Sequence, residues 1–355
     1  MLMMTPGPTE ISRRVRKRMS KPIQNPDIDE DFFEFYRSLE EKLQRVYGKK
    51  DDVLMLGGEG ILGLEASIAS TIEKGDKVLC ISNGIFGDGF ADFVEMYEGK
   101  AEIVDFSYDC PIELEDVKDI IEQDDFEVAT MVHCETPTGT LNELSPILEL
   151  LKENDILTIV DAVSSLGGTP VPTENMDICN GGSQKCFSSP PGLTTLSVSD
   201  EAWDTIMEKE DDHLYTSLKV WKDMWLKNRR FPYTHLVSNL YALEESIDMI
   251  LEKGLEDVFE RHERVSEFCR KRGREIGLEL YPSKKDLCSP TVTAFHVEGE
   301  ALDIQKKIRE EKEILLATGL GKLENDILRV GHMGYNAEKE KVRKTMDALE
   351  DIIKD

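Results

Sequence analysis

Short apolar runs alternate with amphipathic stretches of helical length through the first half of this 355-residue chain. This alternation restricts the possible folds more than any other feature of the sequence. We expect strands at 51–58, 77–84, 102–107, 127–135 and 156–165, separated by helices at 61–75, 86–99, 113–123 and 145–155. Strands that alternate with helices in this way form a parallel sheet covered on both faces. The sequence therefore predicts an α/β fold with a large, mostly parallel sheet.

The pattern changes beyond about residue 240. A long helical stretch at 243–277 precedes expected strands at 291–299 and 327–334, an expected helix at 301–314 and a last helix ending near Ile353. Two or three strands packed with helices predict a smaller α+β domain, and the length of the chain allows two buried cores. We therefore expect an N-terminal segment and large domain at 1–245, and a small C-terminal domain at 246–355.

The charge and the cysteines narrow the function classes. The sequence has 43 Lys and Arg against 71 Asp and Glu, and its net charge of −28 disfavours binding to nucleic acid and to anionic membranes. No apolar stretch reaches the roughly 18 residues of a membrane span, and the start "MLMMTPGPTE" lacks the pattern of a signal peptide. The seven cysteines are scattered without a C-x-x-C pair, which favours reduced thiols in a cytoplasmic protein without a structural metal.

Residues 54–65 read "LMLGGEGILGLE", in which Gly58, Gly60 and Gly63 have the G-x-G-x-x-G spacing of dinucleotide-binding turns. In such a site the next strand ends in an Asp or Glu that holds the ribose hydroxyls, whereas here it ends in Ser82 and Asn83. We therefore disfavour a nicotinamide or flavin enzyme. The helix that begins at Gly60 still directs free N–H groups toward an anion, so another phosphate is expected here.

Two charged residues follow successive strands of the predicted sheet. Asp161 comes directly after the apolar run "ILTIV", and Lys185 lies in "GSQKCFSSPPG" one short segment later. Taken singly, such an Asp more often caps a helix and a Lys is more often a solvated surface residue. Together with a phosphate-binding turn, they are what pyridoxal phosphate requires, since Lys forms a Schiff base with its aldehyde and Asp keeps its ring nitrogen protonated.

Six motifs along the chain resemble the class V aminotransferases of fold type I, in the alanine–glyoxylate and serine–pyruvate aminotransferase branch. They are "TPGPTEIS", "NGIFG", "HCETPTGT", "VDAVSSLGG", "GSQKCFSSPPG" and "ILRVGHMG", and the resemblance covers nearly the whole chain. It implies a fold type I transferase with a large α/β domain and a smaller α+β domain. It also implies pyridoxal 5′-phosphate as the cofactor.

The resemblance assigns roles to individual residues around the cofactor. It implies that Lys185 carries the aldehyde and moves the proton between the substrate α-carbon and C4′, and that Asp161 pairs with the pyridinium nitrogen. The other residues that it places against the cofactor are Phe86 and Val163 on the two faces of the ring, Thr136 beside the ring hydroxyl, and Gln184 with the backbone of Glu59, Gly60 and Ile61 at the phosphate.

Substrate and subunit contacts follow from the same resemblance. Arg329 is expected to hold the substrate α-carboxylate in a bidentate fork, for which a planar guanidinium suits better than Lys. Pro6, Gly7 and Pro8 are expected to line the substrate entrance. The family forms homodimers whose sites combine residues of both subunits, and Thr234 would contact the phosphate of the neighbouring subunit.

Three positions depart from the family pattern. Glu59 stands where relatives often have Ser or Thr at the phosphate, and a carboxylate there must turn away or pair elsewhere, because two anions in contact repel. Phe231 replaces a Tyr that some relatives use as a phosphate donor, so that hydrogen bond is lost unless Tyr233 supplies it. The stretch "THLVS" also differs from the more common Thr-Pro version.

The sequence thus predicts an aminotransferase that moves an amino group between a small amino acid such as alanine or serine and glyoxylate or pyruvate, by a ping-pong mechanism. A 2-aminoethylphosphonate–pyruvate aminotransferase is the nearest alternative, since such chains share the fold and a similar "TPGP" opening. A cysteine desulfurase-like lyase is a second, although Phe86 stands where such an enzyme usually has a His. A binding protein without chemistry is a third, against which Lys185, Asp161 and Arg329 argue.

Overall fold

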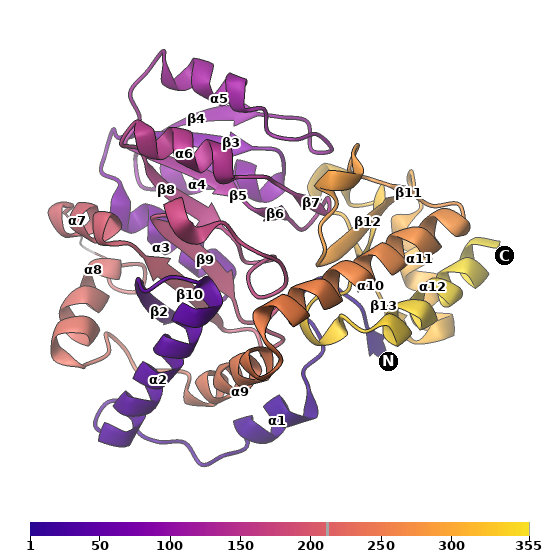
Figure 1. Ribbon diagram of the computed structural model, residues 1–355, viewed down its shortest axis with the longest axis horizontal. Helices are drawn as coiled ribbons and strands as arrows, with labels where there is room; N and C mark the ends of the chain where they lie inside the picture. The colour runs from indigo at the N-terminus through magenta and orange to yellow at the C-terminus, as the bar shows by residue number, and fades with distance from the viewer. Residues whose placement is uncertain (211–212, 355) are drawn as a thin grey trace.

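A seven-stranded sheet forms the centre of the computed structural model, which describes residues 1–210 and 213–354 (Figure 1). From one edge to the other its strands are β2 (Asp52–Gly57), β10 (Leu193–Val198), β9 (Ile178–Gly182), β8 (Leu157–Asp161), β5 (Val128–Val132), β3 (Lys77–Ser82) and β4 (Lys100–Asp105). β10 is antiparallel to both of its neighbours and the remaining pairs are parallel. The predicted mostly parallel sheet is therefore confirmed.

Strand β10 has no counterpart among the strands expected from the sequence. It follows Pro190, Pro191 and Gly192, where the chain turns back along β9. Gly192 has a φ of +125°, a conformation that a residue with a Cβ rarely adopts. The turn explains why this one strand runs against the others, and it carries Pro191 to the edge of the sheet where β9 ends.

Every residue of β5, β8, β9 and β10 is buried. Helices and loops therefore cover both faces in the middle of the sheet. Helices α3 (Gly60–Thr71) and α4 (Ile85–Met96) pack side by side on the strands, and α5 (Leu114–Ile121) contacts α6 (Ser145–Glu153). Helix α2 (Glu30–Tyr47) lies against β2, whereas α7 (Asp200–Glu208) and α8 (Leu218–Trp221) contact α3. The strand β4, at the edge, is mostly exposed.

A smaller antiparallel sheet carries the C-terminal part of the chain (Figure 1). Its strands are β11 (Glu279–Leu280), β12 (Val292–His296), β15 (Ile327–Gly331) and β14 (Ala317–Thr318), accompanied by α10 (Leu255–Glu275), α11 (Ala301–Lys312) and α12 (Lys339–Lys354). The first strand, β1 (Leu2–Met3), pairs in parallel with β13 (Ile314–Leu315), so the start of the chain lies against this part. Separate clusters of buried apolar side chains surround the two sheets, and the boundary at 245/246 stays a prediction.

The long helical stretch expected at 243–277 is two helices. Helix α9 (Val237–Lys253) ends at Gly254, whose φ is +86°, and α10 begins at the next residue. A left-handed residue interrupts the helical hydrogen bonds and redirects the chain. The remaining elements are α1 (Arg13–Met19), the hairpin of β6 (Cys134–Glu135) and β7 (Thr140–Leu141), a π-helical turn η2 (Lys222–Leu226), and 3₁₀ turns η1 (Thr173–Asn175), η3 (Lys285–Leu287), η4 (Gly321–Leu323) and η5 (Gly334–Asn336).

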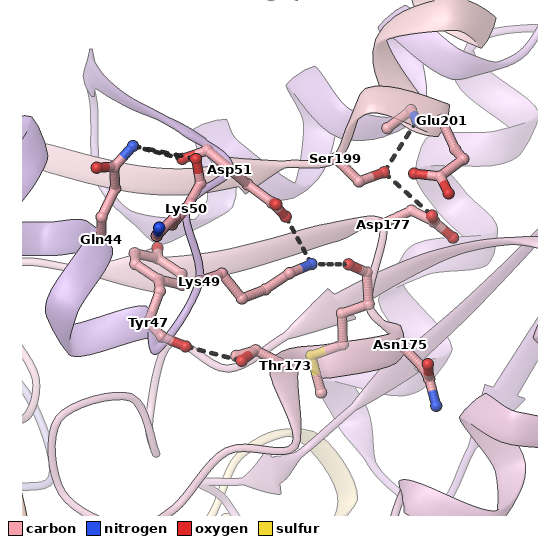
Figure 2. Close-up of polar contacts among 12 residues, drawn as sticks. Gln44, Tyr47, Lys49, Lys50, Asp51, Thr173, Asn175, Asp177, Ser199 and Glu201 are labelled. Carbon is pink, nitrogen blue, oxygen red and sulfur yellow. Dashed lines mark hydrogen bonds and ion pairs between the residues drawn. The ribbon is translucent and has the colours of Figure 1, made fainter.

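Polar contacts hold together the end of the sheet at which the strands β8 and β9 begin (Figure 2). The Nζ of Lys49, just after α2, donates a 2.8 Å hydrogen bond to the carbonyl oxygen of Met176. The carboxylate of Asp177 accepts hydrogen bonds from the backbone N–H of Thr158 at 2.9 Å and from the hydroxyl of Ser199 at 3.1 Å. Because these contacts lie where β8 and β9 begin, they do not occupy the opposite end of the sheet. At that end β8 and β9 finish, and a ligand site can form there.

Candidate active site

A cavity of about 260 Å³ lies at the carboxyl ends of β2, β8 and β9, where open α/β sheets bind their ligands. Its walls come from the N-terminal segment, the start of α3 and α4, and the loops that follow β8 and β9. The lining residues are Gly7, Pro8, Glu59, Gly60, Ile61, Leu64, Phe86, Asp161, Val163, Ser164, Gln184, Lys185 and Pro191. Most of the predicted site residues are therefore together, whereas Pro6, Thr136, Arg329 and Thr234 do not line this cavity.

Lys185 presents an amine to the cavity from the loop after β9. Its Nζ donates a 3.0 Å hydrogen bond to the carbonyl oxygen of Pro6. Burial lowers the pKa of Lys185, the positive charge of Arg329 lowers this pKa further, and Asp161 acts in the opposite direction. A lowered pKa increases the share of neutral amine, which is the form that attacks an aldehyde.

Gly7 makes room for the Lys185 side chain. Its φ is +119°, and a Cβ built on it would lie 2.5 Å from the Cδ of Lys185. Glycine is therefore needed at this position for both its backbone conformation and its small size. Through this contact the N-terminal segment, with Pro8, forms one wall of the cavity.

Asp161 ends β8 with its carboxyl group almost fully buried, since only 5% of the residue is exposed. One carboxyl oxygen accepts a 2.8 Å hydrogen bond from the backbone N–H of Val163. Burial raises the pKa of Asp161 to about 6, although that N–H and the charge of Lys185 act in the opposite direction. A positively charged ring nitrogen beside Asp161 would favour its ionised form. Phe86 and Val163 add apolar surface to the same cavity.

Arg329 on β15 is a buried cation, with 7% of the residue exposed. Its Nε donates to the carbonyl oxygen of Thr318 at 2.6 Å, and its Nη1 donates to that of Thr136 at 3.3 Å. Burial lowers the pKa of Arg329 to about 10. Within residues 1–210 and 213–354, no carboxylate forms an ion pair with it. A buried guanidinium held by carbonyl groups alone is suited to receive an anionic ligand.

Two predicted contact residues have other partners in the isolated chain. The hydroxyl of Thr136 is hydrogen-bonded to that of Ser164, which itself lines the cavity. Thr234 is exposed and donates a 3.2 Å hydrogen bond to the carboxylate of Asp27. The roles predicted for Thr136 at the ring hydroxyl and for Thr234 in a neighbouring subunit stay predictions.

Glu135 is a buried carboxyl group that the sequence analysis missed. It accepts hydrogen bonds from the backbone N–H groups of Gly87 at 2.7 Å and Phe86 at 3.3 Å, at the start of α4. A Cβ on Gly84 would lie 2.3 Å from the carboxyl carbon of Glu135, so that turn must pass close to the side chain. The detectable signal was an acidic residue at the end of the buried run "EVATMVHCE". Glu135 thus holds the segment that presents Phe86 to the cavity.

Neither a metal-ligand cluster nor a membrane-spanning helix is present in the part of the chain that the structure describes. No three His, Cys, Asp or Glu side chains among these residues are grouped as metal ligands. No helix among them combines the length and the apolar character needed to cross a membrane.

Comparisons with known proteins agree with this fold. The sequence profile described as "Aminotransferase class-V" matches residues 18–342. An uncharacterised aminotransferase of Methanocaldococcus jannaschii is 36% identical over 100% of this chain and 93% of its own length. A pyridoxamine–pyruvate transaminase of Mesorhizobium japonicum is 30% identical over 94% of this chain and 87% of its own. The crystal structure of an alanine–glyoxylate aminotransferase from Nostoc sp. superimposes with a TM-score of 0.95 at 27% identity, covering 99% of this chain and 95% of that one.

The fold and the site together define a fold type I aminotransferase. The chain belongs to the class V aminotransferases, as its motifs predicted. This family depends on pyridoxal phosphate, whose pyridine ring supplies the electron sink that stabilises negative charge at the substrate α-carbon.

The ring end and the phosphate end of the cavity differ in how well they suit this cofactor. Lys185, Asp161, Phe86 and Val163 are a reactive amine, a carboxylate and two apolar side chains around one cavity, which fits a pyridine aldehyde. At the start of α3, however, the carboxylate of Glu59 already occupies hydrogen-bond donors predicted for the phosphate. The residues present thus fit the ring, whereas the phosphate would face an anion.

Proposed function

We propose that this aminotransferase moves an amino group between a small amino acid, such as alanine or serine, and glyoxylate or pyruvate. The observation that carries the proposal is that Lys185 and Asp161 line one cavity, with the charge of Arg329 close enough to lower the pKa of Lys185. The names of the similar proteins support the acceptor, since one pairs alanine with glyoxylate and another pairs pyridoxamine with pyruvate. Both acceptors are small 2-oxo acids.

Each of the three residues would perform one part of the reaction. The Nζ of Lys185 would bind the aldehyde covalently and, once released, carry a proton between the substrate α-carbon and C4′ of the ring. The Asp161 carboxylate would keep the ring nitrogen protonated. Arg329 would bind and orient the substrate carboxylate, which would neutralise a buried positive charge.

A ping-pong order of substrate binding follows, because both substrates would use the same amine, that of Lys185, and the same guanidinium, that of Arg329. The amino donor and the oxo-acid acceptor would both need Arg329 for their carboxylates and Lys185 for proton transfer, so they would occupy the site in turn. The first product would leave before the acceptor binds.

The alternatives find less support in the site. A phosphonate substrate calls for several cationic groups, whereas Lys185 is the only cation among the residues that line the cavity. A desulfurase needs a reactive thiol, and no cysteine is among the lining residues. Burial raises the pKa of Cys134 to about 11, which keeps the thiol protonated and weakly nucleophilic.

We propose further that the enzyme is a cytoplasmic homodimer. Ile61 lines the cavity and yet is 39% exposed, and Leu236, two residues from Thr234, is 45% exposed. A second subunit over this surface would bury both side chains and bring its Thr234 to the cavity. The seven cysteines, none of them in a disulfide, are consistent with a reducing compartment. The mass in solution, measured by light scattering, tests the dimer, and a monomer would contradict it.

Covalent trapping tests the central proposal. We would add pyridoxal and pyridoxal phosphate to the purified protein, reduce with borohydride and locate the modified peptide by mass spectrometry. Modification at Lys185 is expected, with none in Lys185→Ala. A panel of amino acids and oxo acids should then identify the pair that is interconverted. An unmodified Lys185, or modification that persists in Lys185→Ala, would refute the proposal.

A further inference from the structure

Glu59 occupies two of the donors with which this site would bind a phosphate, the backbone N–H of Ile61 and the side-chain amide of Gln184. It is the residue directly before α3, and one carboxylate oxygen accepts a 3.1 Å hydrogen bond from the backbone N–H of Ile61. The other carboxylate oxygen accepts a 3.1 Å hydrogen bond from Nε2 of Gln184. The backbone carbonyl oxygen of Glu59 accepts a 2.9 Å hydrogen bond from the next backbone N–H group, that of Leu62. The side chain thus sits as an anion at the positive end of the helix, in the position a phosphate would take.

The charge balance of the cavity also disfavours a phosphate. Its lining residues include two carboxylates, Glu59 and Asp161, and a single cation, Lys185. Within the described ranges 1–210 and 213–354, no Lys or Arg forms an ion pair with Glu59 that could draw its carboxylate away from the helix. A phosphate monoester would bring up to two more negative charges beside Glu59, in a molecule whose net charge is already −28.

Within one subunit, the two aromatic residues expected near the phosphate do not line this end of the cavity. Phe231, in the place of a possible phosphate-binding Tyr, is buried and stacked on Trp225 with ring centroids 4.6 Å apart. The hydroxyl of Tyr233 accepts a 3.3 Å hydrogen bond from the backbone N–H of Gly57, and Tyr233 is not among the residues that line the cavity. Within one subunit, this end of the cavity therefore presents the Glu59 carboxylate as an acceptor where the donors of Ile61 and Gln184 would otherwise face the ligand.

We infer that this site takes pyridoxal and pyridoxamine, the unphosphorylated forms of the ring, in preference to their phosphate esters, because Glu59 fills the phosphate position. The inference rests on the proposed function, in which Lys185 binds the aldehyde. The unphosphorylated ring ends in a 5′-hydroxymethyl group, which is a neutral hydrogen-bond donor. The Glu59 carboxylate is a matching acceptor, so the hydroxymethyl group gains a charge-assisted hydrogen bond where a phosphate meets repulsion.

Because no phosphate group anchors the unphosphorylated ring, the ring can dissociate from the site and act as a substrate. Its covalent link to Lys185 exists only in the aldehyde form, so pyridoxamine is free to exchange with solution and acts as an amino donor in place of the carboxylate-bearing amino acid. The overall reaction is pyridoxamine plus a 2-oxo acid giving pyridoxal plus an amino acid. The C4′–N bond breaks and a C–N bond forms at the acceptor's α-carbon; C4′ loses two electrons and the α-carbon gains two. The water released on condensation is regained on hydrolysis, so no further oxidant is needed.

Parallel titrations of the wild-type protein test this preference. Pyridoxal and pyridoxal phosphate would be added separately, and attachment to Lys185 would be followed by absorbance and confirmed by borohydride trapping. We expect pyridoxal to bind at least about tenfold more tightly. Equal or tighter binding of the phosphate ester would overturn the inference and leave the proposed function intact. Failure of both compounds to attach to Lys185 would overturn both.

Two substitutions at Glu59 test whether the negative charge or the size of its side chain causes the preference for the unphosphorylated ring. Glu59→Gln keeps the size and removes the charge, and Glu59→Ser keeps a good helix-capping residue and opens space. In both variants the preference should shift toward the phosphate ester by about tenfold or more. Glu113→Ser is the matched control, because Glu113 also directly precedes a helix but is exposed and does not line the cavity. Its preference should equal that of the wild type, and an unchanged preference in both Glu59 variants would refute the inference.

Discussion

The carboxylate of Glu135 lies 2.7 Å from the backbone nitrogen of Gly87, at the first turn of α4. Burial raises the pKa of Glu135 to about 8 from an ordinary value of 4.5, although the N–H groups of Gly87 and Phe86 lower it. Between these two pH values the folded protein keeps a proton that the unfolded chain has released. The free energy of unfolding should therefore fall as the pH rises from 4.5 to about 8.

Glu135→Gln should remove this pH dependence. The wild type is expected to lose roughly 2–4 kcal/mol more stability than the variant between about pH 5 and pH 8.5. Urea unfolding of both proteins at the two pH values measures the difference. The contribution of Asp161 is common to both proteins and cancels. Parallel pH profiles for wild type and variant would show that Glu135 is ionised in the folded state at neutral pH.

Arg329 is expected to contribute strongly to substrate binding and little to stability. Arg329→Gln should raise the KM for the oxo acid by about a hundredfold, because a charge-assisted, bidentate contact contributes on the order of 3 kcal/mol. Its free energy of unfolding should change by less than about 1 kcal/mol, since the variant also no longer buries an unpaired charge. Steady-state kinetics and urea unfolding provide the two values. A variant with an unchanged KM would remove Arg329 from substrate binding.

Gly7→Ala should displace Lys185. The added Cβ would lie 2.5 Å from the Cδ of Lys185, at a φ of +119° that alanine rarely adopts. We expect the rate of borohydride-trapped attachment of pyridoxal to fall at least tenfold. Gly89→Ala in α4 is the control: its Cβ would have no atom within 4 Å, and alanine should stabilise the helix by up to about 1 kcal/mol. Equal attachment rates in the two variants would contradict the role of Gly7.

The sequence predicted those parts of the site that depend on local order along the chain. Asp161 was found because it follows an apolar strand, and Lys185 because it lies in "GSQKCFSSPPG" one short segment later, since the carboxyl ends of neighbouring parallel strands converge. Glu59 was recognised as a departure because the family resemblance places Ser or Thr at its position in the glycine-rich turn before α3. Its contact with Gln184 joins residues 125 positions apart, and only the packed structure shows it.

Features that depend on a turn or on distant packing were not predictable. The strand β10 runs against the sheet because of a turn at Gly192 with a positive φ, and the residue pattern of the strand does not encode its direction. Glu135 gains its role from a turn at Gly84, which lies far earlier in the chain, before the helix α4. The sequence predicted one continuous helix through Gly254, because helical periodicity persists on both sides of this residue.

Asp177 should stabilise the fold without affecting the site. Its buried carboxylate accepts hydrogen bonds from the backbone N–H of Thr158 and from the hydroxyl of Ser199, at the end of the sheet opposite the cavity. Figure 2 shows the contact between Ser199 and Asp177. Asp177→Ala leaves these donors without their partner, and we expect a loss of about 3 kcal/mol in the free energy of unfolding. Asp200→Ala, at an exposed position in the first turn of α7, should cost less than about 1 kcal/mol. Both variants, tested well below their unfolding midpoints, should bind pyridoxal as tightly as the wild type. A weaker affinity in Asp177→Ala alone would mean that the two ends of the sheet are coupled.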